Sequence, residues 1–288
     1  MDGIFNLIKP PGMSSSDAVV DIRRLTGVKR VGHLGTLDPG AAGVLPVCVG
    51  RAARLFDYLV DKEKEYLAEI AFGQSTDTQD AFGKVLESAD CHVTAEQLAA
   101  VLPRFRGAIE QVAPMYSALK HEGKKLYDLA LSGAPAVEKK RVIEIGKLEL
   151  IEQTGTNRFL LRVGCSRGTY IRTLCRDIGL ALGLPAHMSF LLRTRSGPFT
   201  LDDAYTIPEL TALAGQGKLE TALISCEQAL NSLPAITLPA DRATPTRNGL
   251  DTRVPNTPNG PVRVYAPAFL GIGEVNQGRL TLKVHLYS

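Results

Sequence analysis

The chain has 288 residues, of which 44% are hydrophobic and 22% are charged, and its net charge at neutral pH is only +3. This composition is that of a folded protein and excludes a disordered chain. The length is sufficient for one large domain and a small one. No apolar run reaches the roughly 18 residues that a membrane-spanning helix needs. No signal peptide is visible at the start, so we expect a cytoplasmic protein without membrane association.

Cysteine and histidine patterns give no indication of a metal site or a disulfide framework. The five cysteines lack Cys-x-x-Cys spacing and the five histidines are scattered, so we expect no metal. Phosphate-binding and dinucleotide-binding motifs are also absent, so we expect no cofactor. Basic residues cluster at positions 23–24, 29–30, 120–125 and 139–141. Because such clusters also occur on ordinary solvated faces, charge alone leaves RNA binding undecided.

The first half of the chain shows helix signals on either side of a loop rich in glycine and proline. Residues 14–27 have a helix-start pattern, apolar residues at near-helical spacing and a closing Gly27. Residues 51–59 predict a second helix. Between the two, the loop runs into a buried apolar segment at 44–49. Residues 66–72 alternate as in a strand, and Thr94-x-x-Gln97 predicts a capped helix.

Further elements follow in an order that predicts an α+β protein. We expect a helix over 124–132, and strands over 142–151 and 159–165, the first with a bulge at Gly146. A helix from about 169 turns apolar residues toward the core. After residue 232 the composition changes and short β-type runs appear at 262–265 and 280–286. We therefore predict an α+β body at 1–232 and a small all-β domain at 233–288.

The loop at 32–45 is the most informative segment, and two interpretations of it stand. Asp38-Pro39-Gly40 is ordinary turn chemistry, and a bare Asp-Pro-Gly is usually only a turn. However, glycines at 32, 35, 40 and 43 permit close approach by another molecule. The buried segment that follows would also hold a carboxylate rigidly, as a reactive group requires.

Five motifs of the chain resemble those of the bacterial tRNA pseudouridine-55 synthase family. The run Gly-His-x-Gly-Thr-Leu-Asp-Pro-x-Ala-x-Gly-Val-Leu at 32–45 is similar to the catalytic motif of that family. The others are Lys-Pro-Pro-Gly-Met-Ser-Ser at 9–15, Lys-Glu-Tyr at 64–66, Pro-Met-Tyr-Ser-Ala-Leu-Lys at 114–120, and Cys-Ser-Arg-Gly-Thr-Tyr-Ile-Arg-Thr-Leu at 165–174. The resemblance implies the pseudouridine synthase fold for the body, with a mixed, largely antiparallel sheet and flanking helices. It also implies isomerisation of one uridine in the T-arm of tRNA.

The resemblance also implies roles for single residues. Asp38 is the expected nucleophile, attacking either C6 of the uracil or C1′ of the ribose, and a carboxylate suits this role because it is ionised at neutral pH. Arg172 is expected to pair with Asp38. Its helical phase, about 100° from Ile171, permits this pairing without requiring it. Tyr66 is expected to stack on the target base, although a strand tyrosine is otherwise unremarkable.

A second group is expected to contact the RNA substrate. His33 would fill the gap left when the uridine leaves its loop, and Leu191 would pack near the base, although a core leucine would look the same. The substrate contacts that complete this expected group are Lys9, Tyr170 and Lys120. Extruding a base costs a few kcal/mol, which stacking and phosphate contacts must offset.

The tail resembles a small PUA-like RNA-binding module. Its length favours a stand-alone bacterial enzyme over the guide-RNA-dependent relatives, so we expect tRNA as the partner, no guide RNA, and a monomer. Three alternatives remain at this point: a non-catalytic RNA-binding protein on the same scaffold, a hydrolase using Asp38 with His33, and pseudouridylation of a different RNA. The hydrolase is disfavoured because no third orienting group or metal is apparent.

Overall fold

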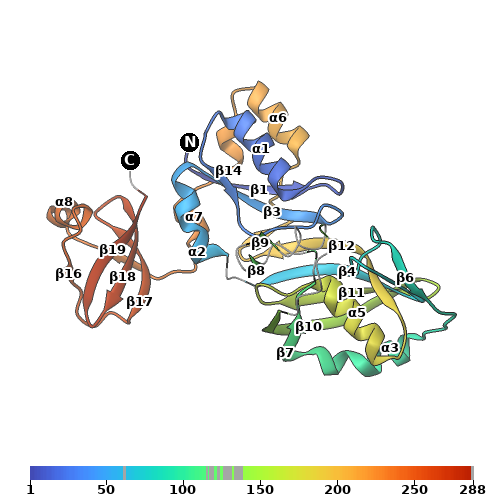
Figure 1. Ribbon diagram of the computed structural model, residues 1–288. Helices are drawn as coiled ribbons and strands as arrows, with labels where there is room; N and C mark the ends of the chain where they lie inside the picture. The colour runs from blue at the N-terminus through green and yellow to red at the C-terminus, as the bar shows by residue number, and fades with distance from the viewer. Residues whose placement is uncertain are drawn as a thin grey trace.

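The computed structural model describes residues 1–60, 63–114, 116, 120–121, 124–125, 132 and 139–286. Within that part of the chain, ten strands form one large sheet (Figure 1). Eight strands follow one another across it in the order β14 (Leu223–Ile224), β1 (Gly3–Lys9), β3 (Ala42–Val49), β12 (Ala186–Ser196), β4 (Lys64–Phe72), β11 (Arg158–Cys165), β10 (Lys140–Gly155) and β7 (Gly107–Val112). The short strands β2 (Val31–His33) and β13 (Phe199–Thr200) pair with β3 and β12.

Strands β3 and β12 are parallel, whereas the other pairs in this sheet are antiparallel. The mixed, largely antiparallel sheet predicted from the sequence is therefore confirmed. The parallel contact joins Leu192 with Ala42 and Arg193 with Gly43. This contact lies where the glycine-rich loop enters β3, so the centre of the sheet supports that loop directly.

The main core lies between the sheet and the longer helices. Helices α1 (Ser15–Thr26) and α6 (Ile207–Gly215) lie near β1, and α3 (Ala95–Val101) and α5 (Ile171–Ala181) lie at the other end of the sheet (Figure 1). All four helices bury apolar residues in this core. Side chains alternate between the faces of a strand. Accordingly, β1 turns Phe5 and Leu7 into the main core and Ile4 into a second core on the opposite face.

The local signals in the sequence identified most element starts. Ser14 and Asp17 form a reciprocal capping box on α1, and Gly27 ends that helix in the left-handed conformation. Thr94 and Gln97 cap α3 in the same way. The pairing of β10 with β11 shifts register between Ile145 and Lys147, which confirms the bulge at Gly146. The expected helix at 51–59 is a 3-10 helix (Gly50–Leu55) followed by α2 (Phe56–Leu59).

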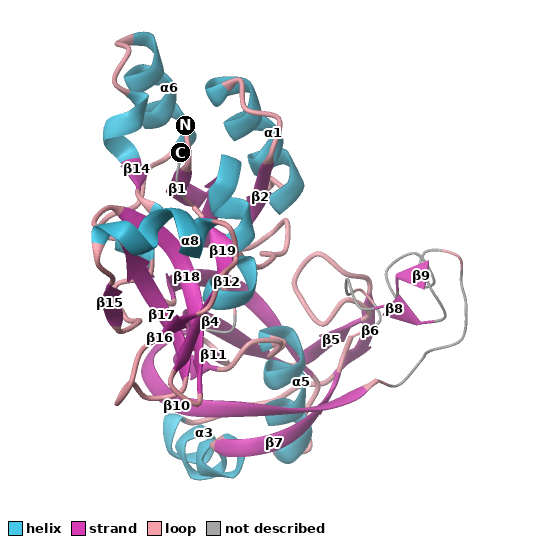
Figure 2. Ribbon diagram, turned by 90° about the vertical axis from the view of Figure 1, so that its left-hand side faces the viewer, coloured by secondary structure: helices cyan, strands magenta, loops and turns pink. Residues whose placement is uncertain are grey.

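The expected helix over 124–132 is wrong at its start. Lys124–Lys125 form strand β9, which pairs with β8 (Lys120–His121), so backbone pairing replaces the helical turn there. The rest of the expected helix lies almost entirely outside the described residues. A further hairpin pairs β5 (Gln74–Thr76) with β6 (Val85–Ser88), and the strands of both hairpins are labelled in Figure 2.

The end of the chain forms a separate small sheet, drawn in orange and red in Figure 1. Its strands follow the order β15 (Ala235–Thr237), β17 (Gly260–Tyr265), β18 (Phe269–Asn276), β19 (Arg279–His285) and β16 (Thr252–Arg253). A 3-10 helix (Leu219–Ala222) follows α6, and α7 (Cys226–Ala229) follows β14. The small sheet carries a 3-10 helix (Ala240–Arg242) and α8 (Ala243–Arg247). Ile272 and Leu286 of this part pack into the second core of the body. None of the helices in the described part of the chain has the length and apolar character that crossing a membrane requires.

Candidate active site

A cleft of about 1300 Å³ opens above the central strands of the body. Its walls come from the loop between β2 and β3, from α2, from the β5–β6 hairpin, from the segment before α5 and from β12. Six residues expected from the sequence line it: His33, Asp38, Tyr66, Tyr170, Arg172 and Leu191. These residues are spread over about 160 positions of sequence, and the fold brings them to one cavity.

Asp38 and Arg172 form the ion pair that the resemblance implied. Arg172 Nε lies 2.9 Å from Asp38 Oδ2, and Arg172 Nη2 lies 3.3 Å from Asp38 Oδ1. The arginine side chain is only 6% exposed, whereas the Asp38 side chain is 37% exposed. A two-point contact of this kind fixes the orientation of a carboxylate. Arg172 therefore holds Asp38 from the protein side and leaves it accessible from the cleft.

Arg172 is itself held by two backbone carbonyl groups. Its Nη1 donates to the Thr78 oxygen at 3.0 Å and its Nη2 donates to the Tyr116 oxygen at 2.9 Å. The Asp80 carboxylate lies 3.9 Å from Nη1 and supplies a second negative charge. The burial of a guanidinium is tolerated only with such partners. Sequence reasoning identified Arg172 but missed Thr78 and Asp80, whose segment shows only turn-type residues.

The loop that carries Asp38 is a turn as well as a site. The Ala41 amide donates to the Asp38 carbonyl at 3.0 Å, as expected for an Asp-Pro-Gly turn. The neighbouring Leu34, Leu37 and Ala41 side chains are all buried. The ordinary and the functional interpretations of this loop are therefore compatible, because the turn projects the carboxylate while its apolar residues anchor the backbone.

Lys9 has a structural position that differs from the expected substrate contact. It is fully buried, and its Nζ donates to the carbonyl groups of Pro10 (2.8 Å), Met13 (2.7 Å) and Pro39 (3.2 Å). Burial lowers the pKa of Lys9 to about 8, and the nearby Asp38 opposes this shift. Because its ammonium is enclosed by backbone oxygens, Lys9 ties the N-terminal segment to the Asp38 loop. The expectation that it contacts RNA disagrees with this geometry.

Arg193 is a buried support of the same loop that sequence reasoning missed. Its side chain is 1% exposed and donates to the carbonyls of Val44 (2.6 Å), Gly35 (3.2 Å) and Thr36 (3.3 Å). A Cβ at Gly43 would collide with the Arg193 backbone. The only sequence signal for Arg193 was its position at the end of the Phe-Leu-Leu-Arg run at 190–193, which also contains the expected site residue Leu191.

Tyr66 and Leu191 form part of the buried floor of the cleft. They are 7% and 6% exposed, on the neighbouring strands β4 and β12. Burial raises the pKa of the Tyr66 phenol, while the positive charge of Arg193 opposes the shift. The phenol is therefore neutral near pH 7, which suits packing against an uncharged base.

His33 and Tyr170 occupy the sides of the cleft. Burial, together with the charge of Arg193, lowers the pKa of His33, so its imidazole is neutral near pH 7. Among the described residues, none forms a hydrogen bond with its buried Nδ1. The Tyr170 backbone is fixed by Gln111, whose amide side chain accepts from the Tyr170 N–H (2.8 Å) and donates to its carbonyl (3.1 Å). The side chain of Lys120 lies outside the described residues.

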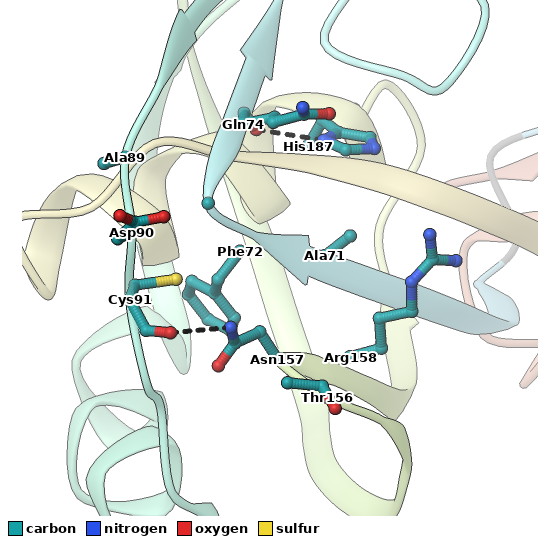
Figure 3. A pocket seen from close by; sticks show the side chains of 11 residues that line it. Ala71, Phe72, Gln74, Ala89, Asp90, Cys91, Thr156, Asn157, Arg158 and His187 are labelled. Carbon is teal, nitrogen blue, oxygen red and sulfur yellow. Dashed lines mark hydrogen bonds between the residues drawn. The ribbon is translucent and has the colours of Figure 1, made fainter.

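A second, shallower hollow of about 320 Å³ shares no lining residue with this cleft. Asn157, in a left-handed conformation (φ 56°), donates from Nδ2 to the Cys91 carbonyl at 2.8 Å (Figure 3). Its Oδ1 accepts from the Val93 amide at 2.9 Å, and His187 Nδ1 lies 2.9 Å from the Gln74 carbonyl oxygen. These polar groups bond to the backbone of the protein, so we interpret the hollow as a structural junction.

Comparison with known proteins assigns the family. The profile of the TruB family pseudouridylate synthase N-terminal domain matches residues 23–171. Two C-terminal profiles follow, that of the tRNA pseudouridylate synthase B C-terminal domain at 172–243 and that of the pseudouridine synthase II TruB C-terminal region at 234–284. The chain belongs to the TruB family. It is therefore a pseudouridine synthase, an isomerase, and its cleft is that of a TruB enzyme.

Curated relatives cover most of the chain. The tRNA pseudouridine synthase B of Pelotomaculum thermopropionicum is 45% identical over 91% of this chain and 84% of its own. That of Symbiobacterium thermophilum is 48% identical over 87% of this chain and 83% of its own, and that of Pseudomonas putida strain F1 is 43% identical over 97% and 94%.

Solved structures confirm the fold. An H/ACA ribonucleoprotein bound to a substrate RNA containing 2′-deoxyuridine includes a chain with a TM-score of 0.76 and 26% identity, over 99% of this chain and 85% of that one. A Cbf5–Nop10–Gar1 complex gives a TM-score of 0.75 and 27% identity, over 99% and 84%. The pseudouridine synthase fold expected from the sequence is thus confirmed.

Proposed function

We propose that this TruB enzyme converts uridine 55 in the T-arm loop of tRNA to pseudouridine, with Asp38 as the nucleophile. The observation that carries the proposal is the Asp38–Arg172 pair, oriented by two contacts and open to a cleft of sufficient size for a nucleotide. The names of the curated relatives support tRNA as the substrate.

The chemistry follows from what each residue offers. Asp38 attacks C6 of the uracil or C1′ of the ribose. By either route the N1–C1′ bond breaks, a C5–C1′ bond forms, and the proton lost from C5 is balanced by one gained at N1. Because the reaction is an isomerisation, it needs no oxidant and no reductant. A carboxylate suits the role since it can attack and then leave.

Substrate binding requires the uridine to leave its stack, because C5 and C1′ are inaccessible within a stacked loop. Tyr66 and Leu191 supply the apolar floor on which the extruded uracil rests. His33 stands at the side of the cleft, where a neutral ring can fill the gap left in the RNA. Arg141 and Arg167, which line the cleft, are suited to phosphate contacts.

The remaining proposals concern partners and organisation. We propose a catalytic domain at 1–232 and a PUA-like RNA-binding domain at 233–288, in a cytoplasmic monomer that acts without guide RNA, metal or cofactor. The separate sheet at the end of the chain supports this division.

Mapping of pseudouridines tests the proposal directly. Unmodified tRNA is incubated with the purified protein alone, in buffer with EDTA, and pseudouridine positions are mapped before and after. We expect conversion at position 55 only. Conversion elsewhere would assign a different RNA site. A requirement for added zinc or for a second RNA would contradict the metal-free, guide-free reaction.

A further inference from the structure

Exposed phenylalanines concentrate at the active-site cleft. All nine phenylalanines of the chain lie in its described part, and three of them are exposed: Phe56 (38%), Phe82 (76%) and Phe190 (46%). All three line the cleft. Exposed aromatic rings gathered at one cavity indicate a binding surface rather than random surface composition.

Phe82 is the most exposed of the three, and it lies beside the catalytic loop. A Cβ added to Gly40 would collide with the Phe82 ring, so the ring rests directly on the Gly40 backbone. Gly40 is two residues beyond Asp38. One face or edge of the ring is thus supported by the loop, while most of its surface remains open to solvent.

The segment that carries Phe82 is fixed to the catalytic arginine. The Phe82 amide donates to Asp80 Oδ1 at 3.0 Å, and Thr78 Oγ1 donates to the same oxygen at 2.6 Å. The Thr78 carbonyl in turn accepts from Arg172 Nη1 at 3.0 Å. Phe82 is therefore held in a defined position relative to the Asp38–Arg172 pair.

The same segment also joins the wall that carries Phe190. Asp80 forms a parallel β-bridge with Met188, and the Ala81 amide donates to the Met188 carbonyl at 3.1 Å. Phe82 lies two residues after Asp80, and Phe190 lies two residues after Met188. Both residues line the cleft.

Phe82 and the floor of the cleft differ strongly in solvent exposure. Tyr66 and Leu191 are 7% and 6% exposed, whereas Phe82 is 76% exposed. A base that reaches Asp38 rests on the buried floor and leaves the outer ring free. A strand of RNA entering the cleft carries a further base on either side of its target.

We propose that Phe82 is a stacking platform for the unpaired nucleobase next to the target uridine in the RNA strand. The proposal rests on the proposed function and adds a substrate contact to it. Proteins bind unpaired RNA bases by stacking them on aromatic rings, and a sequence-tolerant platform needs no hydrogen-bonding partner. Arg141 and Arg167, which line the same cleft, can neutralise the phosphates of that strand.

Substitution of Phe82 tests the contact. Binding is measured in an Asp38→Asn background, so that the RNA stays unmodified, with a T-arm stem–loop as the probe. We expect Phe82→Ala to raise the dissociation constant about tenfold and Phe82→Trp to retain wild-type affinity. Leu86→Ala is the matched control, because Leu86 is 69% exposed on the same hairpin but does not line the cleft. Equal affinities for Phe82→Ala and Leu86→Ala would overturn the proposal.

Abasic RNAs identify the stacked base. The stem–loop is prepared with an abasic nucleotide on the 5′ side or on the 3′ side of the target. On one of these RNAs we expect Phe82→Ala to leave the dissociation constant unchanged, because the stacked base is already missing. On the other RNA we expect the tenfold rise in the dissociation constant to remain. An equal rise in the dissociation constant on both RNAs would refute stacking on a neighbouring base.

Turnover separates this inference from the proposed function and from a merely structural role. With Asp38 intact, we expect the single-turnover rate of Phe82→Ala at saturating enzyme to stay within about twofold of wild type. A large drop on every RNA would show instead that Phe82 supports Gly40 and the Asp38 loop. If the wild-type protein converts no uridine, the proposed function fails, while the binding measurements still decide the stacking contact.

Discussion

The hydroxyl group of Ser15 holds both backbone groups of Leu37. Ser15 Oγ accepts a hydrogen bond from the Leu37 amide at 2.8 Å and donates one to the Leu37 carbonyl at 2.9 Å. Both residues are buried, and Leu37 immediately precedes Asp38. The first turn of α1 is thereby fastened to the Asp38 loop, so the geometry of the carboxylate depends on a residue that need not touch substrate.

We predict that Ser15→Ala lowers both stability and catalytic rate. The buried amide and carbonyl of Leu37 would lose their partner, which costs about 1–3 kcal/mol of unfolding free energy. Urea unfolding and single-turnover kinetics measure the two effects. Ser16→Ala is the control, because Ser16 is exposed in the same helix turn. Equal stability of the two variants would show that the Leu37 contacts contribute little.

Asp38→Asn is expected to abolish turnover and to preserve folding and RNA binding. The change is nearly isosteric, but an amide is a very poor nucleophile. Single-turnover assays with unmodified tRNA check the rate, and filter binding checks the affinity. Residual activity within about tenfold of wild type would exclude Asp38 as the nucleophile.

Arg172→Lys is expected to be strongly damaging although it keeps the charge. An ammonium group has no planar fork to hold both Asp38 oxygens and also reach the Thr78 and Tyr116 carbonyls. We expect the loss mainly in the saturated rate, with affinity for RNA nearly unchanged. A variant that lost affinity alone would place Arg172 among the phosphate contacts.

Local signals in the sequence were sufficient to predict much of the fold. Caps such as Ser14 with Asp17 act within one helical turn, so they are visible without tertiary information. The buried alternation of β4 was visible for the same reason. Strand β9 was expected to be the start of a helix, because its pairing with β8 leaves no apolar pattern in the sequence.

The site was predictable only where a motif carried it. The Asp38–Arg172 pair joins residues 134 positions apart, and helical phase permitted that contact without requiring it. The family resemblance supplied the pairing, which the structure contains. Arg193 and Thr78 were missed because their contacts involve backbone carbonyls: Arg193 donates to the Val44 carbonyl, and the Thr78 carbonyl accepts from Arg172. These partners are defined only after β12 and the β5–β6 hairpin have packed. The burial of Lys9, which disagrees with the expected RNA contact, could not be read from a motif.

The stability of the protein should rise between about pH 8 and 10 because of Lys9. Its pKa is lowered to about 8 in the folded state from 10.5, so the unfolded state binds more protons in this interval. Below pH 8 the buried ammonium of Lys9 is charged and destabilises the folded state in full. This destabilisation decreases as the pH rises and Lys9 loses its proton. Relative to Lys9→Met, wild type should gain about 1 to 2 kcal/mol between pH 8 and 9.5. Urea unfolding of both proteins at each pH checks this, since other titrating groups cancel in the difference. A constant difference would show that the pKa of Lys9 is unshifted.

The small C-terminal sheet places two like charges directly opposite each other, which is unfavourable unless an anion binds near them. Arg253 on β16 and Arg279 on β19 are direct register partners, and both are exposed. Residues directly opposite in an antiparallel pair project from the same face, where like charges repel. An anion bound between or above them would offset this repulsion, and RNA phosphates are the anions that this enzyme meets.

We therefore predict that Arg253→Gln with Arg279→Gln weakens tRNA binding without slowing chemistry on bound RNA. Both positions are remote in sequence from Asp38 and lie outside the residues that line the cleft. The expected effect is a several-fold rise in the dissociation constant and a shallower dependence of affinity on salt, because fewer counterions are released. The double variant should unfold at the same urea concentration or slightly higher, since the repulsion is removed. Filter binding across salt concentrations, with single-turnover rates at saturating enzyme, measures both properties. An unchanged salt dependence would show that this pair does not contact phosphate, and a large fall in the saturated rate would assign the C-terminal sheet a part in forming the active site.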